Sequence, residues 1–141
     1  KKEGAVMREK IFAATNDALS EVMSFTEECL QSFGCPMKSS VAICVAVEEI
    51  FVNIASYAYG ESSGNAALTF GFDEAQRLMT LVVTDEGIPF NPLQRDEPDI
   101  TLSAADREIG GLGIFITRKT MDTVDYRYEN GKNILTMTKK I

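Results

Sequence analysis

Asp85-Glu-Gly-Ile-Pro-Phe-Asn-Pro92 is the stretch from which the fold of this chain can be inferred. It follows a run of β-branched and apolar residues, Leu78 to Thr84, which predicts a strand. A carboxylate at the end of a strand can hold the edge of a base, and glycine admits the close backbone approach that a flat ring or a phosphate requires. Asp85, Gly87 and Pro89 also suit a simple strand-end turn, so this motif alone favours the two interpretations about equally.

A second motif lies upstream, in Glu49-Ile-Phe-Val-Asn53. Residues four apart share one face of a helix, so Glu49 and Asn53 lie one turn apart. An amide oxygen together with phosphate oxygens and water suits Mg²⁺, and a neighbouring carboxylate can orient or deprotonate a nucleophile. In isolation, a solvated polar stripe is the commoner explanation for such a pair, by roughly four to one.

A third motif, Gly110-Gly111-Leu112-Gly113, precedes a predicted helix. Free N–H groups and the positive end of a helix favour phosphate at such a place, although a flexible hinge has the same composition. No Gly-Lys-Ser/Thr follows, which excludes a Walker A loop, and the preceding long polar loop excludes a Rossmann fingerprint.

The composition narrows the class of protein. With 141 residues, the chain is expected to form a single domain over residues 1–141. Its net charge of -7 argues against direct nucleic-acid binding through phosphate contacts. The sequence has no histidine, which excludes Ser-His-Asp catalysis, phosphohistidine chemistry and most zinc sites.

Cysteine usage and hydropathy indicate a cytoplasmic protein without a membrane partner. Cys29, Cys35 and Cys44 form no Cys-x-x-Cys pair and are expected to be free thiols in a reducing compartment. We expect no segment long and apolar enough to span a bilayer, and Lys1-Lys2-Glu3-Gly4 has no signal-peptide character.

Hydrophobic periodicity predicts an α+β fold, a two-layer sandwich with helices on one face of a mostly antiparallel sheet. The expected strands are 6–14, 66–72, 78–84, 124–128 and 134–138. The expected helices run from an N-cap at Asn16 to Gly34, from 39 to 59, and from 112 to 121. The middle helix is apolar nearly all round and is therefore expected to be buried. Residues 86–110 are expected to form a long functional loop or lid.

Taken together and in this order, the three motifs resemble those of the GHKL (Bergerat-fold) ATPases. Glu49-x-x-x-Asn53 is similar to the N box, Asp85-x-Gly87-x-Pro89 to the G1 box, and Gly111-Leu112-Gly113 to the G2 box. The Phe-Asn-Pro tail of the G1 motif, the Gly-Leu-Gly-Ile-Phe-Ile-Thr-Arg helix and the ending from Asn133 to Lys139 resemble the bacterial anti-sigma-factor serine kinases. The resemblance covers residues from about 10 to 141.

The resemblance implies a Bergerat fold, a mixed, mostly antiparallel sheet of about five strands with three helices on one face and a long ATP lid. It implies that ATP and Mg²⁺ bind, with Asn53 as the metal ligand and Asp85 on the adenine amino group. Gly87 and Pro89 would shape the base pocket. The Gly110-Gly111-Leu112-Gly113 segment would close over the phosphates. Glu49 would be the general base that acts on a serine hydroxyl or on water.

The expected function is therefore that of an anti-sigma factor with ATP-dependent serine kinase activity. The family's partners are a STAS-type anti-anti-sigma protein, which is the substrate, and a sigma factor, and a homodimer is expected from the family alone. The alternative is a nucleotide-gated binding module without phosphotransfer; the ATP-binding half of a sensor histidine kinase is less favoured.

This chain departs from the family at Tyr57, where some relatives have histidine. Basic residues often precede the G2 glycines in the family, where this chain has Glu108-Ile109. Arg107 and Arg118 are the nearest cations, and which of them, if either, meets phosphate stays open.

Overall fold

The computed structural model describes residues 5–60, 62–94 and 111–141, and these form a layer of helices against one sheet. The five strands are β1 (Ala5–Ala13), β2 (Asn65–Asp73), β3 (Leu78–Asp85), β4 (Thr123–Glu129) and β5 (Lys132–Lys140). Their order across the sheet is β1-β2-β3-β5-β4, and every neighbouring pair is antiparallel. The predicted strands are confirmed, and every pairing among the described strands is antiparallel, where a mixed, mostly antiparallel sheet was expected.

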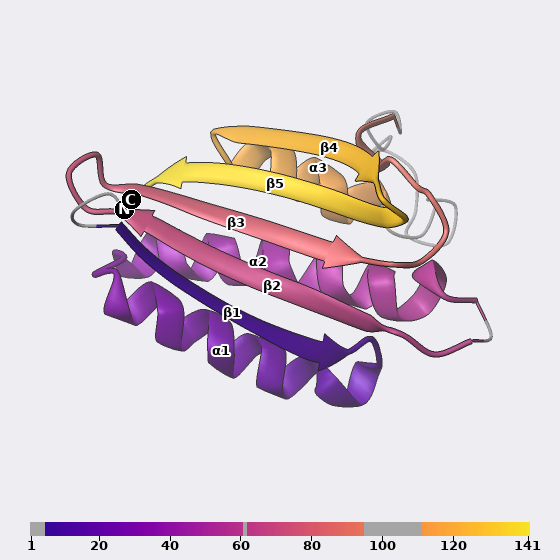
Figure 1. Cartoon of the computed structure of the whole chain (residues 1–141). Coiled ribbons are helices and arrows are strands. Elements are labelled where there is room, and N and C mark those ends of the chain that lie inside the picture. The colour runs from indigo at the N-terminus through magenta and orange to yellow at the C-terminus, as the bar shows by residue number, and fades with distance from the viewer. Residues whose placement is uncertain (1–4, 61, 95–110) are drawn as a thin grey trace.

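Three α-helices cover one face of the sheet, as predicted: α1 (Leu19–Ser32), α2 (Met37–Asn53) and α3 (Gly111–Thr120). Figure 1 shows α1 beneath β1, α2 along the middle of the sheet and α3 behind β4 and β5. The C-terminal ends of α2 and β3, the start of α3 and the turn between β4 and β5 all lie at the same end of the molecule. This end therefore gathers all three sequence motifs.

Strict alternation along the strands explains why the helices pack on one face only. In β2 and β3, every second residue is buried, and the residues between them are half-exposed. Successive strand residues point to opposite faces of a sheet, so the buried set faces the helices. Phe70 in β2 and Leu81 in β3 are register partners at the centre of this core, and neither is exposed. The core extends into α1 through Phe25, whose ring meets that of Phe70 edge-on at 5.8 Å.

The segment before α1 differs from the prediction. Residues Asn16–Ala18 form a short 3₁₀ turn, and α1 begins at Leu19. Thr15 and Ala18 occupy the cap positions, and neither makes a capping hydrogen bond through its side chain. The expected N-cap at Asn16 was therefore wrong, because the chain tightens into a 3₁₀ turn before it reaches helical geometry.

The middle helix is less buried than its composition predicts. Met37, Val41 and Val45 follow one another at intervals of four residues and are exposed by 78%, 56% and 42%. Together with the turn that follows it, this helix spans Met37–Ala58 and is long and apolar enough to cross a membrane by length and composition. This corrects the expectation that no segment reaches that size, although the helix at the centre of a folded core meets the same criteria.

Arg77 joins three parts of the chain at the β2–β3 turn. Its guanidinium donates hydrogen bonds to the carbonyl oxygens of Phe33 (3.3 Å) and Gly34 (3.1 Å), at the end of α1, and to Ile141 O (3.2 Å). It also lies over the ring of Phe72, 4.9 Å from the centroid. A cation near the last carbonyls of a helix is favoured by the helix dipole. Arg77 therefore fixes the end of α1 to the sheet.

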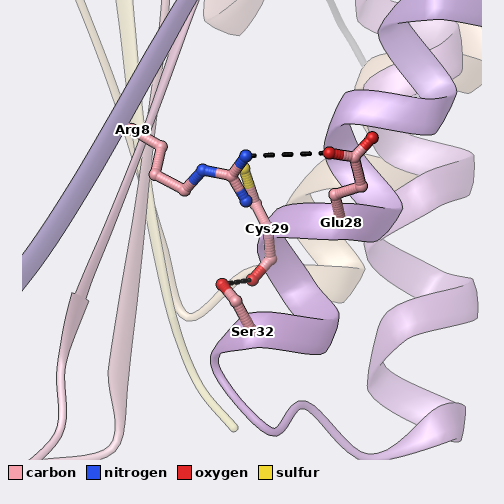
Figure 2. Close-up of polar contacts among 4 residues, drawn as sticks. All are labelled: Arg8, Glu28, Cys29 and Ser32. Carbon is pink, nitrogen blue, oxygen red and sulfur yellow. Dashed lines mark hydrogen bonds and ion pairs between the residues drawn. The ribbon is translucent and has the colours of Figure 1, made fainter.

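A second link between a strand and α1 lies in the C-terminal half of the same helix (Figure 2). Arg8 on β1 reaches across to Glu28 on α1, with 3.7 Å between Nη2 and Oε1, and Cys29 lies below this pair. The hydroxyl of Ser32 donates to the Cys29 carbonyl at 2.7 Å. Because both charged groups are partly exposed, the ion pair contributes at most about 1 kcal/mol.

An open groove of about 570 Å³ runs between β1 and α1. Its walls carry charges of both signs, with Arg8 and Lys10 on the strand and Glu21 and Glu28 on the helix. The lining includes none of the residues that the sequence motifs nominate. The groove is therefore separate from the predicted nucleotide site.

The central position of Phe70 gives a stability prediction. Phe70→Ala should lower the free energy of unfolding by about 3–5 kcal/mol, because it removes a fully buried ring and leaves a cavity. Val82→Ala, on the half-exposed face of β3, is the matched control and should cost about 1 kcal/mol or less. Urea unfolding measures both, and equal losses for the two variants would contradict the one-sided packing.

The buried thiol gives a prediction about pH. Burial raises the pKa of Cys29, while the nearby Arg8 lowers it by less. The neutral thiol therefore stabilises the folded state fully below the unfolded pKa of about 8.5, and this contribution is lost as pH rises through the higher folded pKa. The free energy of unfolding should fall more steeply between pH 8 and pH 10 in the wild type than in Cys29→Ala. Parallel pH profiles would show that Cys29 does not titrate differently in the two states.

Candidate functional site

Asp85 is the last residue of β3 and is only 8% exposed. Its Oδ1 atom accepts two hydrogen bonds, from the backbone N–H of Gly87 at 2.9 Å and from the side-chain amide of Asn133 at 3.0 Å. Within the described ranges, Oδ2 receives no hydrogen bond from the protein. Buried polar atoms are normally paired, so a buried carboxylate oxygen without a donor indicates a place for a ligand N–H.

Asn133 organises the corner around Asp85. The two residues are direct register partners on β3 and β5. The Asn133 amide nitrogen donates to Asp85 and to the carbonyl of Ile88 at 2.9 Å. Its oxygen accepts from the backbone N–H of Phe90 at 3.0 Å and from the hydroxyl of Tyr126. One buried side chain therefore holds the carboxylate and both ends of the loop 88–90.

Sequence reasoning did not nominate Asn133 or Tyr126 as site residues, although the sequence contains a signal for the asparagine. In β5, Leu135 and Met137 are buried, and Asn133 has the same parity. An amide at a core-facing position requires partners, because burial of an unpaired polar group is costly. A polar residue that interrupts an apolar alternation is the pattern that predicts such a position.

The loop after β3 packs against the end of the helix that carries the second motif. The backbone N–H of Ile88 donates to the carbonyl of Ala58 at 2.8 Å. A Cβ atom added at Gly87 would lie 2.2 Å from that same carbonyl oxygen. Glycine is therefore required at position 87 because two backbones meet there. This adds a reason to the prediction that Gly87 admits a base.

Glu49 and Asn53 lie one turn apart near the end of α2, and both are partly buried. Asn53 is the last residue of the α-helix, and a π-helical turn, Ile54–Ala58, begins directly after it. Such π turns inside or at the end of helices are frequently found at functional sites. The turn brings Ala58 against Gly87, so the two motifs are physically joined.

The third motif is described in part. Gly111, Leu112 and Gly113 form the first residues of α3, which contacts α2. The first N–H groups of a helix have no partner within it, so this end suits an anion. Residues 95–110 of the predicted lid, which include Arg107 and Gly110, lie outside the described residues. Arg118 is described, and its guanidinium donates to the carbonyl of Leu93 at 2.9 Å, which fixes the loop after β3 to α3.

Two tyrosines border the corner, and both have a raised pKa. Burial is the main cause for Tyr59 and for Tyr126, and the negative charge of Asp85 adds to it in each case. Both hydroxyls therefore keep their protons at neutral pH and serve as hydrogen-bond donors. Tyr126 donates to Asn133, and Tyr59 donates to the carbonyl of Asn65.

An antiparallel sheet covered by helices, with a Glu/Asn helix against an Asp-x-Gly loop, defines a nucleotide-binding ATPase domain of the histidine-kinase type. The comparison with protein families agrees, because residues 12–139 match the family described as the histidine kinase-like ATPase domain. The chain belongs to this family. The recognised GHKL resemblance and the α+β fold are thereby confirmed, whereas the roles of the individual site residues stay predictions.

Named relatives are serine kinases. The chain is 31% identical over 101 residues to the serine-protein kinase RsbW of Bacillus thuringiensis (strain Al Hakam), covering 69% of this chain and 61% of that protein. It is 28% identical over 102 residues to the serine/threonine-protein kinase BtrW of Bordetella bronchiseptica, covering 72% and 70%. The chain thus spans about three fifths of the length of the RsbW relatives that it matches.

A solved structure shares the fold. The crystal structure of the RsbU and RsbW domains of Rv1364c from Mycobacterium tuberculosis matches with a TM-score of 0.68. The match covers 96% of this chain and 32% of that chain, at 15% sequence identity. At this identity the likeness shows the fold alone.

The Asn133 network gives a further stability prediction. Asn133→Ala should lower the free energy of unfolding by about 1–3 kcal/mol, because it leaves the buried partners of the amide unsatisfied. Thr136→Ala, on the half-exposed face of the same strand, should change it by about 0.5 kcal/mol or less. Chemical denaturation of the two variants measures the difference, and a neutral Asn133→Ala would show that water replaces the amide without cost.

Proposed function

We propose that this chain is an ATP-dependent protein serine kinase and anti-sigma factor. Its substrate is a small STAS-domain anti-anti-sigma protein. The kinase sequesters a sigma factor until the unphosphorylated anti-anti-sigma protein is available to compete for the kinase. Two kinds of observation support the proposal: the chain's membership of an ATPase family and the serine kinase names of its relatives. The net charge of -7 fits a partner-binding regulator better than a protein that touches nucleic acid directly. We place it in the cytoplasm, as a homodimer.

The buried carboxylate of Asp85 is the observation that carries the nucleotide-binding part. Gly87 and Asn133 hold Oδ1, so the carboxylate is oriented before any ligand binds. Oδ2 is then available to accept a hydrogen bond from the exocyclic amine of adenine. A preorganised acceptor loses little conformational entropy on binding, which favours affinity. Pro89 and the Gly87 backbone would line the adjoining side of the base.

The residues at the end of α2 fit a magnesium ion. Asn53 offers a hard amide oxygen, and Mg²⁺ commonly takes one or two protein oxygens with phosphate oxygens and water. The described part of the chain gathers no group of three or more Cys, Asp or Glu side chains, so the nucleotide's phosphates would complete the set. When bound, the ion would neutralise phosphate charge during transfer. The start of α3, with Gly111 and Gly113, would supply N–H groups to the same phosphates.

Glu49 carries the transfer step. Its carboxylate removes the proton from the substrate serine hydroxyl, and the oxygen forms a bond to the γ-phosphorus. The bond from the γ-phosphorus to the bridging oxygen breaks, and ADP leaves with that electron pair. Glu49 lies one turn before Asn53 on the same helix face, so the base and the magnesium-binding amide have a fixed spacing of one helical turn.

The decisive experiment combines the purified protein with MgATP and STAS-domain proteins from its own genome. Phosphoserine on one of them is the expected result, and its absence on all of them would refute the kinase proposal. If the protein then still binds nucleotide and a partner, the alternative function holds, which is a nucleotide-gated binding module without phosphotransfer.

Two variants separate binding from transfer. Glu49→Gln should keep ATP binding within about threefold and lower the rate of phosphoserine formation by about 10²–10⁴-fold, because only the base is removed. Asp85→Asn should instead weaken ATP binding about tenfold to a hundredfold, since it replaces a charged acceptor. Calorimetric titration and a single-turnover assay measure the two effects. Normal transfer by Glu49→Gln would rule out Glu49 as the base.

A further inference from the structure

The π-helical turn at the end of α2 delivers a side chain to the nucleotide corner that none of the sequence motifs includes. The turn Ile54–Ala58 follows Asn53 directly, and Tyr59 is the next residue. Because a π turn holds more residues than an α turn, it changes the direction in which the following side chains leave the helix. Tyr59 is partly buried and leaves the helix toward the G1 loop and the start of β2, which it contacts.

The hydroxyl of Tyr59 bridges two backbone groups from different elements. It accepts a hydrogen bond from the N–H of Glu86 at 2.8 Å and donates its own proton to the carbonyl of Asn65. The direction of both bonds is fixed, because an amide N–H only donates and a carbonyl only accepts. Since burial raises the pKa of Tyr59, the proton that the second bond needs stays in place at neutral pH.

The ring of Tyr59 is fixed as well. A Cβ atom added at Gly64 would lie 2.2 Å from ring atom Cε1, so the ring lies directly on the backbone of Gly64. Its neighbour Ala58 accepts the hydrogen bond from Ile88. Ala58 and Tyr59 thus hold the loop on either side of Gly87. Ala58 binds Ile88, and Tyr59 binds Glu86.

We propose that Tyr59 is a positioning residue that sets where Asp85 lies relative to Asn53 and thereby gives the site its preference for adenine. The Glu86 peptide that it holds is bonded directly to Asp85. Asn133 and Gly87 orient the carboxylate within the loop, whereas Tyr59 fixes the loop to the helix that carries Glu49 and Asn53. The proposal rests on the proposed nucleotide site, and it concerns nucleotide binding whether or not phosphate is transferred.

The test is Tyr59→Phe, which keeps the ring and removes the bridging oxygen. Tyr59→Phe should weaken ATP binding about fivefold to tenfold, as expected for the loss of one hydrogen bond, and change GTP binding less than twofold. The matched control is Tyr57→Phe, in the π turn just before Tyr59 and half-exposed, which should leave both affinities unchanged. Competition against a fluorescent nucleotide gives the dissociation constants.

A double-mutant cycle separates positioning from general support of the fold. If Tyr59 acts through Asp85, Tyr59→Phe should cost less than twofold in ATP affinity when Asp85→Asn is already present. A purely structural role would weaken ATP and GTP equally, or would give the same loss in both backgrounds, and either result overturns the proposal. A wild-type protein with no preference for ATP over GTP also overturns it. A selective protein that fails to phosphorylate any STAS partner refutes only the kinase function.

Discussion

The close contact between the backbones of Gly87 and Ala58 is the constraint on which the rest of the site depends. It brings the end of a helix and the end of a central strand together without any side chain between them. Only glycine permits this separation, and the hydrogen bond from Ile88 to Ala58 fixes it. Asp85 then occupies a set position because it lies two residues before Gly87, and Asn53 and Glu49 do so because the helix that carries them continues into the turn that ends at Ala58.

Much of the architecture could be predicted from the sequence because it depends on local patterns. The apolar alternation in residues 66–72 and 78–84 predicted the bounds of β2 and β3 nearly to the residue. Glycines marked the end of α1 and the start of α3. The three site motifs could be found because their order along the chain is distinctive. The sequence predicted more burial for the apolar middle helix than the structure shows, because composition does not reveal which face of a helix the other elements leave exposed.

The parts that could not be predicted depend on contacts between residues distant in sequence. Asn133 bonds to Asp85 from 48 residues away, and Tyr59 bonds to Glu86 from 27 residues away. The π turn is equally hidden, because residues Ile54–Ala58 fit an α-helix just as well by propensity. The reason for Gly87 also emerged only in three dimensions, since a strand-end turn and a helix contact both favour glycine.

The strand order has a consequence for when the corner around Asp85 forms during synthesis. The central strand β3 pairs on one side with β5, near the end of the chain, and β4 is attached to the sheet only through β5. A nascent chain that stops before β5 therefore has an open sheet edge at β3 and lacks Asn133, so the Asp85 carboxylate loses its side-chain hydrogen-bond donor. Pairings between such distant segments form late, because loop closure costs entropy before any contact is made. The corner around Asp85 is thus completed only when β5 joins the sheet, because Asn133 is the residue that orients the carboxylate and the loop 88–90.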